Sequence, residues 1–482
     1  MNTQRFLWAL MGSMAFVSCK KDPPAYYGGY PVDVGKIIIT KCANEGCHTS
    51  GSADACCEGL DLSSWTNLFT KGSEHGSPVI PYSSKFSSLC YHINTYPDLG
   101  LMSQPTMPLN QQPLSREEVV KIKQWIDQGA PDVNGRVYGS NLYDKVYVVN
   151  QGCDVITVLD AQSQLPIRMI DVGADPNRIE TPHFINFSPD GKYWYVVFVN
   201  SPYLEKYDAN TDKLVARCNL NNEVGWNRII ITKDGKKGFC VAWTSNGKVI
   251  SVDLEKMQVI HSMYGLYFPH GAILSKNDDT LYVAAQTGNF FMKIDTALTG
   301  YVSVPIDHSG TINYAPSLDP HDILASPDGT KLYFTCQGSN EIREFDLTTH
   351  MVTHIISVGT FPQAMAYSQV YHTLYVSCEL DNNGSSMGSM GSMGSIVAID
   401  LNTYTTQRVY VGYQPHGIAL DEKNNLLYVP NRNLAGSGMP PHHSSLCTGR
   451  NGFVSVLDIP SLSIKKEHIE LSVDSYFAKV RP

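Results

Sequence analysis

The sequence predicts a multidomain chain, with a small all-α part followed by a larger all-β part made of repeated units. Three observations lead to this prediction. A capped amphipathic helix ends near residue 131, and β-branched and aromatic runs recur from residue 143 onward. The chain of 482 residues is also too long for one simple hydrophobic core.

The N-terminus has the features of an export signal. Arg5 precedes an apolar run from Phe6 to Val17 that is too short to span a bilayer. The end of this run resembles a bacterial lipoprotein box, which implies cleavage before Cys19 and acylation of that residue. Phe16 departs from the usual Leu, so plain secretion is the alternative. We expect an exported lipoprotein in the periplasm or at the outer membrane or cell surface, with membrane contact through the lipid.

The most informative segment is Cys42-Ala43-Asn44-Glu45-Gly46-Cys47-His48. Two thiols followed at once by an imidazole form the attachment pattern of c-type haem, although four residues separate these cysteines where two are usual. A structural zinc site is the first alternative, but the segment has no tidy second pair of ligands. A disulfide between Cys42 and Cys47 is the second, and it would leave His48 unexplained.

A second ligand and a closing helix follow this segment. Met107 lies in a Met-Pro loop, and Ser115 with Glu118 predicts a capping box at the start of a helix that stops near Gly129. These features resemble small bacterial cytochrome c domains over about residues 32–131. The resemblance implies thioether bonds at Cys42 and Cys47, with His48 as proximal and Met107 as distal haem ligand. Met102 and His92 are the rival distal ligands.

Composition limits the remaining possibilities. The net charge is −9 and 17% of the residues are charged, which makes nucleic acid an unlikely partner. We expect a signal peptide at 1–18, a linker at 19–31, a cytochrome c-like haem domain at 32–133 and a repeat domain at 143–482.

The repeat domain is predicted to be a seven-bladed β-propeller. A short phrase at the start of one strand recurs roughly every 42–53 residues, and each third strand ends in Asp, which is typical of propeller blades. The phrase begins at Pro182, Trp226, Pro269, Pro320, Pro362 and Pro415. The repeats resemble the Tyr-Val-Thr-Asn family of propellers.

Closure of the ring is also predicted. The first blade lacks the recurring phrase, and residues 475–480 are the candidate to supply its missing strand and so remove an exposed edge. Cys153 and Cys447 lie in equivalent loops of the first and last blades, which favours a disulfide across the seam.

Histidines are expected to gather at one mouth of the propeller channel. His183, His270, His321 and His416 share one repeat position, with Asn227 and Gln363 in two other blades. Two insertions, one with Met-Gly-Ser triplets at 386–393 and one containing His442 and His443, are expected on the same face. The simplest interpretation is structural hydrogen bonding between blades. Imidazole, thioether and thiol together would instead suit copper.

Three functions follow from these features. The first is electron transfer by an exported c-type cytochrome, with a redox protein or a small molecule as donor or acceptor. The second is a cell-surface binding or scaffold propeller whose haem acts as relay or sensor. The third is a copper-dependent oxidoreductase with its site among the histidines of the propeller mouth.

Overall fold

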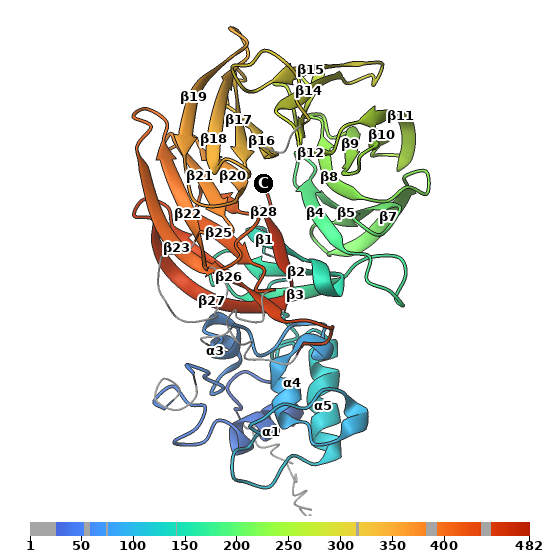
Figure 1. Cartoon of the computed structure of the whole chain (residues 1–482). Coiled ribbons are helices and arrows are strands. Elements are labelled where there is room, and N and C mark those ends of the chain that lie inside the picture. The colour runs from blue at the N-terminus through green and yellow to red at the C-terminus, as the bar shows by residue number, and fades with distance from the viewer. Residues whose placement is uncertain are drawn as a thin grey trace, which may run out of the picture.

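The computed structural model describes residues 26–52, 58–73, 76–140, 142–314, 318–381, 393–434 and 445–482. Its α-helices lie in residues 26–140, here called the helical region, and its strands form a β-propeller from residue 145 onward (Figure 1). Within the described ranges, no helix is long and apolar enough to cross a membrane.

The helical region packs around one hydrophobic cluster. Its helices, including two short 3-10 turns, are α1 (Val32–Lys41), α3 (Trp65–Thr70), η1 (Ser84–Phe86), α4 (Ser88–Ile93), η2 (Pro97–Leu99) and α5 (Arg116–Asp127). The apolar faces of α1 and α5 meet in this cluster, where Ile38 and Ile126 are almost fully buried.

The start and end of α5 match the sequence. The Ser115 hydroxyl accepts from the backbone of Glu118, and the Glu118 carboxylate accepts from the backbone of Ser115. This capping box satisfies two backbone donors of the first turn. At the other end, Gly129 takes the left-handed conformation with φ 100°, which glycine adopts without strain.

Seven four-stranded antiparallel sheets make up the described part of the propeller, which confirms the seven blades. The innermost strands are β28 (Ser475–Val480), β4 (Pro182–Phe187), β8 (Trp226–Ile231), β12 (Pro269–Leu274), β16 (Pro320–Ala325), β20 (Pro362–Ser368) and β24 (Ala419–Asp421). The second strands are β1 (Lys145–Asn150), β5 (Tyr193–Phe198), β9 (Lys237–Ala242), β13 (Thr280–Ala285), β17 (Lys331–Cys336), β21 (Thr373–Cys378) and β25 (Leu426–Asn431).

The outer half of each blade completes the sheet. The third strands are β2 (Val155–Asp160), β6 (Tyr203–Asp208), β10 (Gly247–Asp253), β14 (Phe290–Asp295), β18 (Glu341–Asp346), β22 (Met393–Asp400) and β26 (Asn451–Asp458). The outermost strands are β3 (Pro166–Asp171), β7 (Lys213–Asn219), β11 (Gln258–Leu266), β15 (Tyr301–Pro305), β19 (Met351–Ser357), β23 (Thr406–Tyr413) and β27 (Ser463–Val473).

The recurring Asp at the end of each third strand has a local cause. The Asp208 carboxylate, for example, accepts hydrogen bonds from the backbone of Asn210 and Thr211 at 3.0 and 2.8 Å. Such bonds fix the tight turn into the outermost strand. The repeat therefore marks turns and not a charged site.

The C-terminal strand closes the ring. β28 is the innermost strand of the first blade and pairs antiparallel with β1, as the sequence predicts. Cys153 and Cys447 form the predicted disulfide across the seam between the first and last blades. One strand and one covalent bond thus join the two ends of the propeller.

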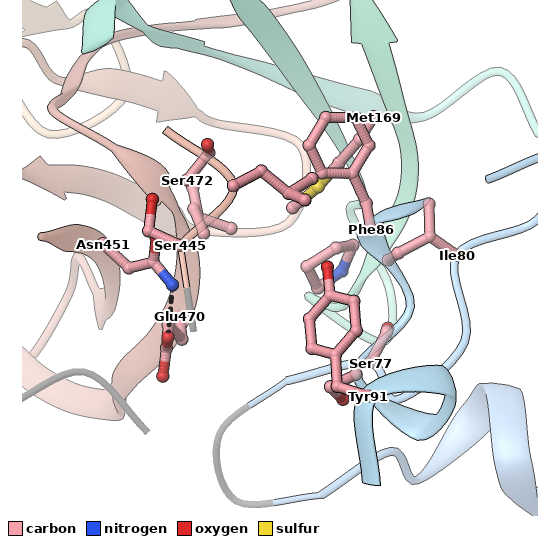
Figure 2. Close-up of a pocket in the computed structure, with 13 residues that line it drawn as sticks. Ser77, Ile80, Phe86, Tyr91, Met169, Ser445, Asn451, Glu470 and Ser472 are labelled. Carbon is pink, nitrogen blue, oxygen red and sulfur yellow. Dashed lines mark hydrogen bonds between the residues drawn. The ribbon is translucent and has the colours of Figure 1, made fainter. Parts of the chain in front are cut away.

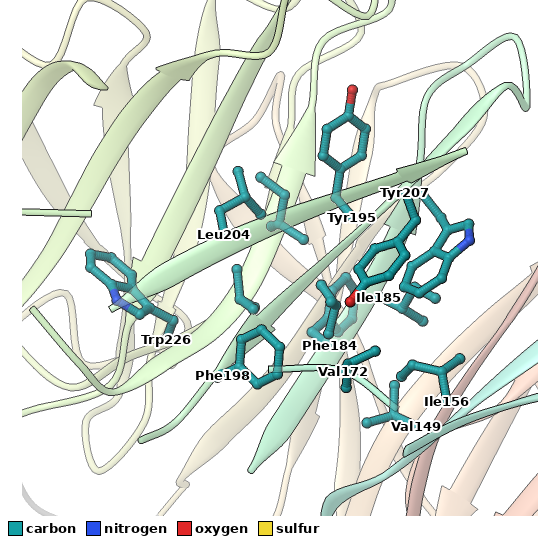
Figure 3. Packing of buried hydrophobic residues seen from close by; sticks show 14 of the residues in the cluster. Val149, Ile156, Val172, Phe184, Ile185, Tyr195, Phe198, Leu204, Tyr207 and Trp226 are labelled. Carbon is teal, nitrogen blue, oxygen red and sulfur yellow. The ribbon is translucent and has the colours of Figure 1, made fainter. Parts of the chain in front are cut away.

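Neighbouring blades are held together by apolar side chains. Figure 3 shows Val149 of the first blade, Tyr195 and Phe198 of the second and Trp226 of the third in one continuous cluster. These side chains are at most 1% exposed. Full burial of such large groups is the main stabilising contribution, since each removes apolar area from water.

The helical region packs beside β3 and β27 of the first and last blades (Figure 1). The Tyr138 hydroxyl donates to Asp160 at 2.9 Å, and the Lys85 ammonium lies 2.8 Å from the Asp171 carboxylate. The Arg168 guanidinium lies over the ring of Tyr82, 5.1 Å from its centroid. The region therefore covers outer strands that would otherwise present open sheet edges.

Candidate functional site

The cysteine–histidine segment begins where α1 ends. Cys42 caps the helix through its backbone N–H, which donates to Ile38, and its side chain is 7% exposed. The backbone of His48 donates to the Cys42 carbonyl at 3.3 Å, so the segment folds back on itself. Cys47 lies between them at an intermediate exposure. The three candidate haem-binding residues are thus neighbours in space as well as in sequence.

His48 has a defined orientation. Its Nδ1 lies 3.1 Å from the carbonyl oxygen of Leu60. A carbonyl only accepts hydrogen bonds, so Nδ1 carries the proton and Nε2 keeps its lone pair. Burial lowers the pKa of His48 and also favours this neutral form. Metal-binding histidines commonly hold their second nitrogen in this way.

The loop that offers the Leu60 carbonyl is fixed by Asp61, whose side chain is almost completely buried. Its carboxylate accepts from the hydroxyls of Ser50 and Ser63, both at 2.6 Å, from the Asn67 amide and from the Lys71 ammonium. Burial alone would raise the pKa of Asp61, but these hydrogen bonds lower it to about 2.

The three candidate distal ligands differ in their surroundings. Met107 packs against the same hydrophobic cluster that contains Cys42, and its backbone donates to the His92 carbonyl at 2.8 Å. Met102 is 48% exposed. The Nδ1 of His92 lies 2.9 Å from the Pro105 carbonyl. Among these residues, Met107 is the thioether that the fold turns toward the core.

Four imidazoles of the propeller come together with Tyr476 in a closed ring. The ring centroids are separated by 6.3 Å for His183–His270, 3.9 Å for His270–His321, 5.4 Å for His321–His416, 3.8 Å for His416–Tyr476 and 4.5 Å for Tyr476–His183. Because these residues come from five different blades, the ring must surround the central channel where the innermost strands begin. We call these five side chains the mouth ring.

Backbone geometry explains why these side chains point inward. The pairing of the innermost with the second strand shifts register at this position, for example between Pro269 and Ala272 and between Pro320 and Ile323. Such bulges redirect a side chain away from the regular alternation of a strand. The residue two positions before the mouth-ring position, immediately before the recurring phrase or β28, has positive φ in all seven blades. These residues are Thr181, Gly225, Phe268, Asp319, Phe361, Gln414 and Asp474.

Two imidazoles of the mouth ring also join neighbouring blades. His270 Nδ1 lies 2.9 Å from the His321 carbonyl, and His321 Nδ1 lies 3.0 Å from the Gln363 carbonyl. Each Nδ1 therefore carries the proton, and each Nε2 keeps a lone pair. For His270 and His321, the structural interpretation from sequence agrees with these contacts.

The other two imidazoles do not make this inter-blade bond. His183 has its Nδ1 2.6 Å from the Gln151 side-chain amide and its Nε2 3.2 Å from the Tyr476 hydroxyl. His416 stacks on the ring of Tyr476, and its Nδ1 is buried without a hydrogen-bond partner. Both belong to the side of the ring nearest the seam.

Burial governs the protonation of the mouth ring. It lowers the pKa of all four imidazoles, to about 4 for His321, and raises that of Tyr476. The ring is thus neutral near pH 7. Its charged neighbours are paired: Arg228 with Asp322, and Arg432 with Asp474 at 2.8 Å.

Sequence reasoning did not find Tyr476. It occupies the second position of β28, which is the position held by histidine in four other blades. The signal was present, since residues 475–480 were expected to supply the missing innermost strand. Alignment of that strand with the recurring phrase places Tyr476 at the histidine position.

Several predicted residues lie outside the described ranges. These are Cys19, the insertion of residues 386–392, and His442 with His443. Met393, the last methionine of the triplets, is the first residue of β22. Among the His, Cys, Asp and Glu side chains that the structure describes, no three are grouped to hold a metal ion.

A small pocket lies between the helical region and the seam. Figure 2 shows Phe86 and Tyr91 of the helical region facing Met169 of β3 and Glu470 of β27. The Asn451 amide donates to the Glu470 carboxylate at 2.7 Å. Phe86 and Met169 also pack against the cluster around Cys153, so the pocket adjoins the disulfide that closes the ring.

These features define the chain as a seven-bladed β-propeller preceded by a helical region. The solved structures that this chain is similar to include the following three. Hydrazine synthase of Kuenenia stuttgartiensis has 20% identity and a TM-score of 0.48, covering 60% of this chain and 80% of that one. A functionally unknown protein of Desulfotomaculum acetoxidans has 15% identity and a TM-score of 0.52, and the match covers 70% of this chain and 98% of that one.

The third is a proposed 6-phosphogluconolactonase of Bacteroides uniformis, with 12% identity and a TM-score of 0.51, covering 69% of this chain and 98% of that one. No family model and no curated protein matches the sequence. At these identities, the two structures with a TM-score above 0.5 show the propeller fold alone, since one fold hosts many functions.

Proposed function

We propose that the helical region carries a covalently attached c-type haem and that the protein transfers electrons. The observation that supports this most is the bond between His48 Nδ1 and the Leu60 carbonyl. It leaves Nε2 as the available donor, directly after the two cysteines, which is the arrangement a proximal ligand requires.

Each residue of the segment has its own part in the proposal. Cys42 and Cys47 would hold the porphyrin through thioethers, and His48 and Met107 would be the ligands of its iron. Bound haem would supply one-electron chemistry. The Lys41 ammonium, 2.6 Å from the Glu118 carboxylate, ties the end of α1 to the start of α5 and so steadies the segment between them.

The propeller is proposed to bind the redox partner, either a protein or a small electron donor or acceptor. Its fold suits a binding or scaffold role, because function in propellers resides at the loops and channel mouths. We further propose export and a lipid anchor at Cys19, on the sequence alone. If the haem is only a relay or sensor, the holoprotein will bind partners and turn over no small oxidant.

The haem proposal is tested by retention of colour. Wild-type protein should keep its chromophore through denaturing gel electrophoresis, because thioethers survive unfolding, and Cys47→Ser should lose most of it. Cys90→Ser is the matched control, since Cys90 is a buried free thiol of the same region. Loss of all haem from denatured wild type would show that the assignment is wrong.

A further inference from the structure

We propose that Tyr476, His183 and His416, on the seam side of the mouth ring, form a transition-metal site with copper(II) as its occupant. This site is independent of the haem proposal, because it shares no residue with the helical region. The sequence predicts copper among all the histidines of the mouth. The proposed site uses only two of these histidines and adds the phenol of a tyrosine.

The first argument is the separation of two donor atoms. The Tyr476 hydroxyl oxygen and His183 Nε2 are 3.2 Å apart. Two ligands bound to one metal ion at about 2.0–2.1 Å, with an angle between right and tetrahedral, are separated by about 2.8–3.4 Å. The pair is therefore already spaced as neighbouring ligands, and without metal the same spacing makes a hydrogen bond.

The second argument is an unpartnered donor. His416 is 6% exposed, and its Nδ1 has no hydrogen-bond partner, although the ring stacks directly on Tyr476. A buried polar atom left without a partner has lost its hydrogen bonds to water, which is unfavourable unless something binds it. A metal ion beside Tyr476 would use this imidazole once its ring turns Nδ1 toward the ion.

Contacts with neighbouring side chains support the two other ligands, His183 and Tyr476. Gln151 lies 2.6 Å from His183 Nδ1 and orients Nε2 toward Tyr476; a half-turn of the Gln151 amide presents its oxygen as the acceptor. The Arg432 guanidinium lies over the ring of Tyr476, 4.9 Å from its centroid.

The phenol is essential to this inference. No three described His, Cys, Asp or Glu side chains group around one metal position, so imidazoles alone do not make the site. Binding replaces the Tyr476 O–H bond with an oxygen–copper bond and releases one proton to solvent, with no change of oxidation state. Copper(II) is chosen because it binds nitrogen and oxygen ligands most tightly among the divalent first-row metals.

The test uses the full-length holoprotein, stripped of loosely bound metal and titrated with copper(II). We expect one copper per chain by elemental analysis, a copper EPR signal distinct from that of ferric haem, and a phenolate-to-copper charge-transfer band. Tyr476→Phe should abolish the band and weaken binding by at least about 10–100-fold. Tyr282→Phe, a buried tyrosine of the fourth blade, is the matched control and should change neither.

A second variant keeps the result decisive if Tyr476→Phe does not fold. His183→Gln should weaken copper binding similarly, whereas His270→Asn should preserve it, since Asn already holds this position in the third blade. The inference is overturned if wild type binds no copper, or if the folded Tyr476→Phe or His183→Gln protein retains full affinity. Because these readouts do not involve haem attachment, they are independent of the colour-retention test.

Discussion

The two candidate sites of this chain are built in opposite ways. In the helical region, the cysteines and histidine lie within seven consecutive residues, and short local bonds hold them. In the propeller, the mouth ring draws one side chain from each of five blades, and His183 and Tyr476 are separated by 293 positions. The first site depends on a local motif, and the second depends on closure of the whole ring.

Because of this difference, the two sites should be lost through different structural changes. A local site survives as long as its own segment folds, whereas a ring site is lost when any blade leaves the circle. The seam is the weakest point of such a circle, because only there is a blade assembled from the two ends of the repeat array. Changes at the seam should therefore affect the mouth ring and spare the helical region.

The largest effect is expected from deleting residues 475–482. The deletion removes β28, leaves the edge of β1 open and takes away Arg481, which donates to Gly191 and Ala209 in the next blade at 2.9 and 3.0 Å. We expect the propeller to lose cooperative unfolding and to become sensitive to proteolysis, while the haem colour stays with a fragment of the helical region.

The measurement is limited proteolysis followed by a gel stained for covalent haem. Removal of Pro482 alone is the control, because this exposed residue lies beyond β28. A deleted protein that resists protease as the wild type does would contradict the role of β28, and simultaneous loss of haem would show that the two regions depend on each other.

A smaller effect, confined to the helical region, is expected from Met107→Ala. Loss of the proposed thioether should remove the weak near-infrared band of Met-ligated ferric haem and lower the reduction potential, because thioether ligation raises it. Met102→Ala is the matched control, since this side chain is 48% exposed. The reverse result, with the band lost only in Met102→Ala, would place the distal ligand on the other methionine.

The sequence predicted most of the fold because its signals repeat. Seven third strands that each end in Asp led to seven blades, and the missing phrase of the first blade pointed to residues 475–480. Cys153 and Cys447 could be paired because ring closure makes their loops neighbours. Each of these inferences used position within a repeat, which the sequence displays directly.

The finer arrangement could not be predicted from the same signals. His270 and His416 look identical in sequence, yet His270 bonds to the next blade and His416 does not. The equivalent carbonyl for His416 is that of Tyr476, which accepts the backbone N–H of Gly417, and the His416 ring stacks on the Tyr476 ring. Such a difference depends on atomic positions at the seam, which the repeat pattern does not display.

The smallest effect is expected from Asp61→Asn, which tests the loop that orients His48. The variant keeps the shape of the side chain but loses a charged acceptor of hydrogen bonds from Ser50, Ser63 and Lys71. Folding lowers the pKa of Asp61 from its ordinary 3.8 to about 2, so its contribution is present above pH 4 and is lost as the pH falls toward 2.

That shift corresponds to about 2 kcal/mol at neutral pH. Urea unfolding of the helical region should therefore show wild type more stable than Asp61→Asn by this amount near pH 7, with the difference shrinking as the pH falls from about 4 toward 2. Asp98→Asn is the control, because its pair with Arg116 is exposed and contributes little. A pH-independent difference would mean that Asp61 acts through shape and not through charge.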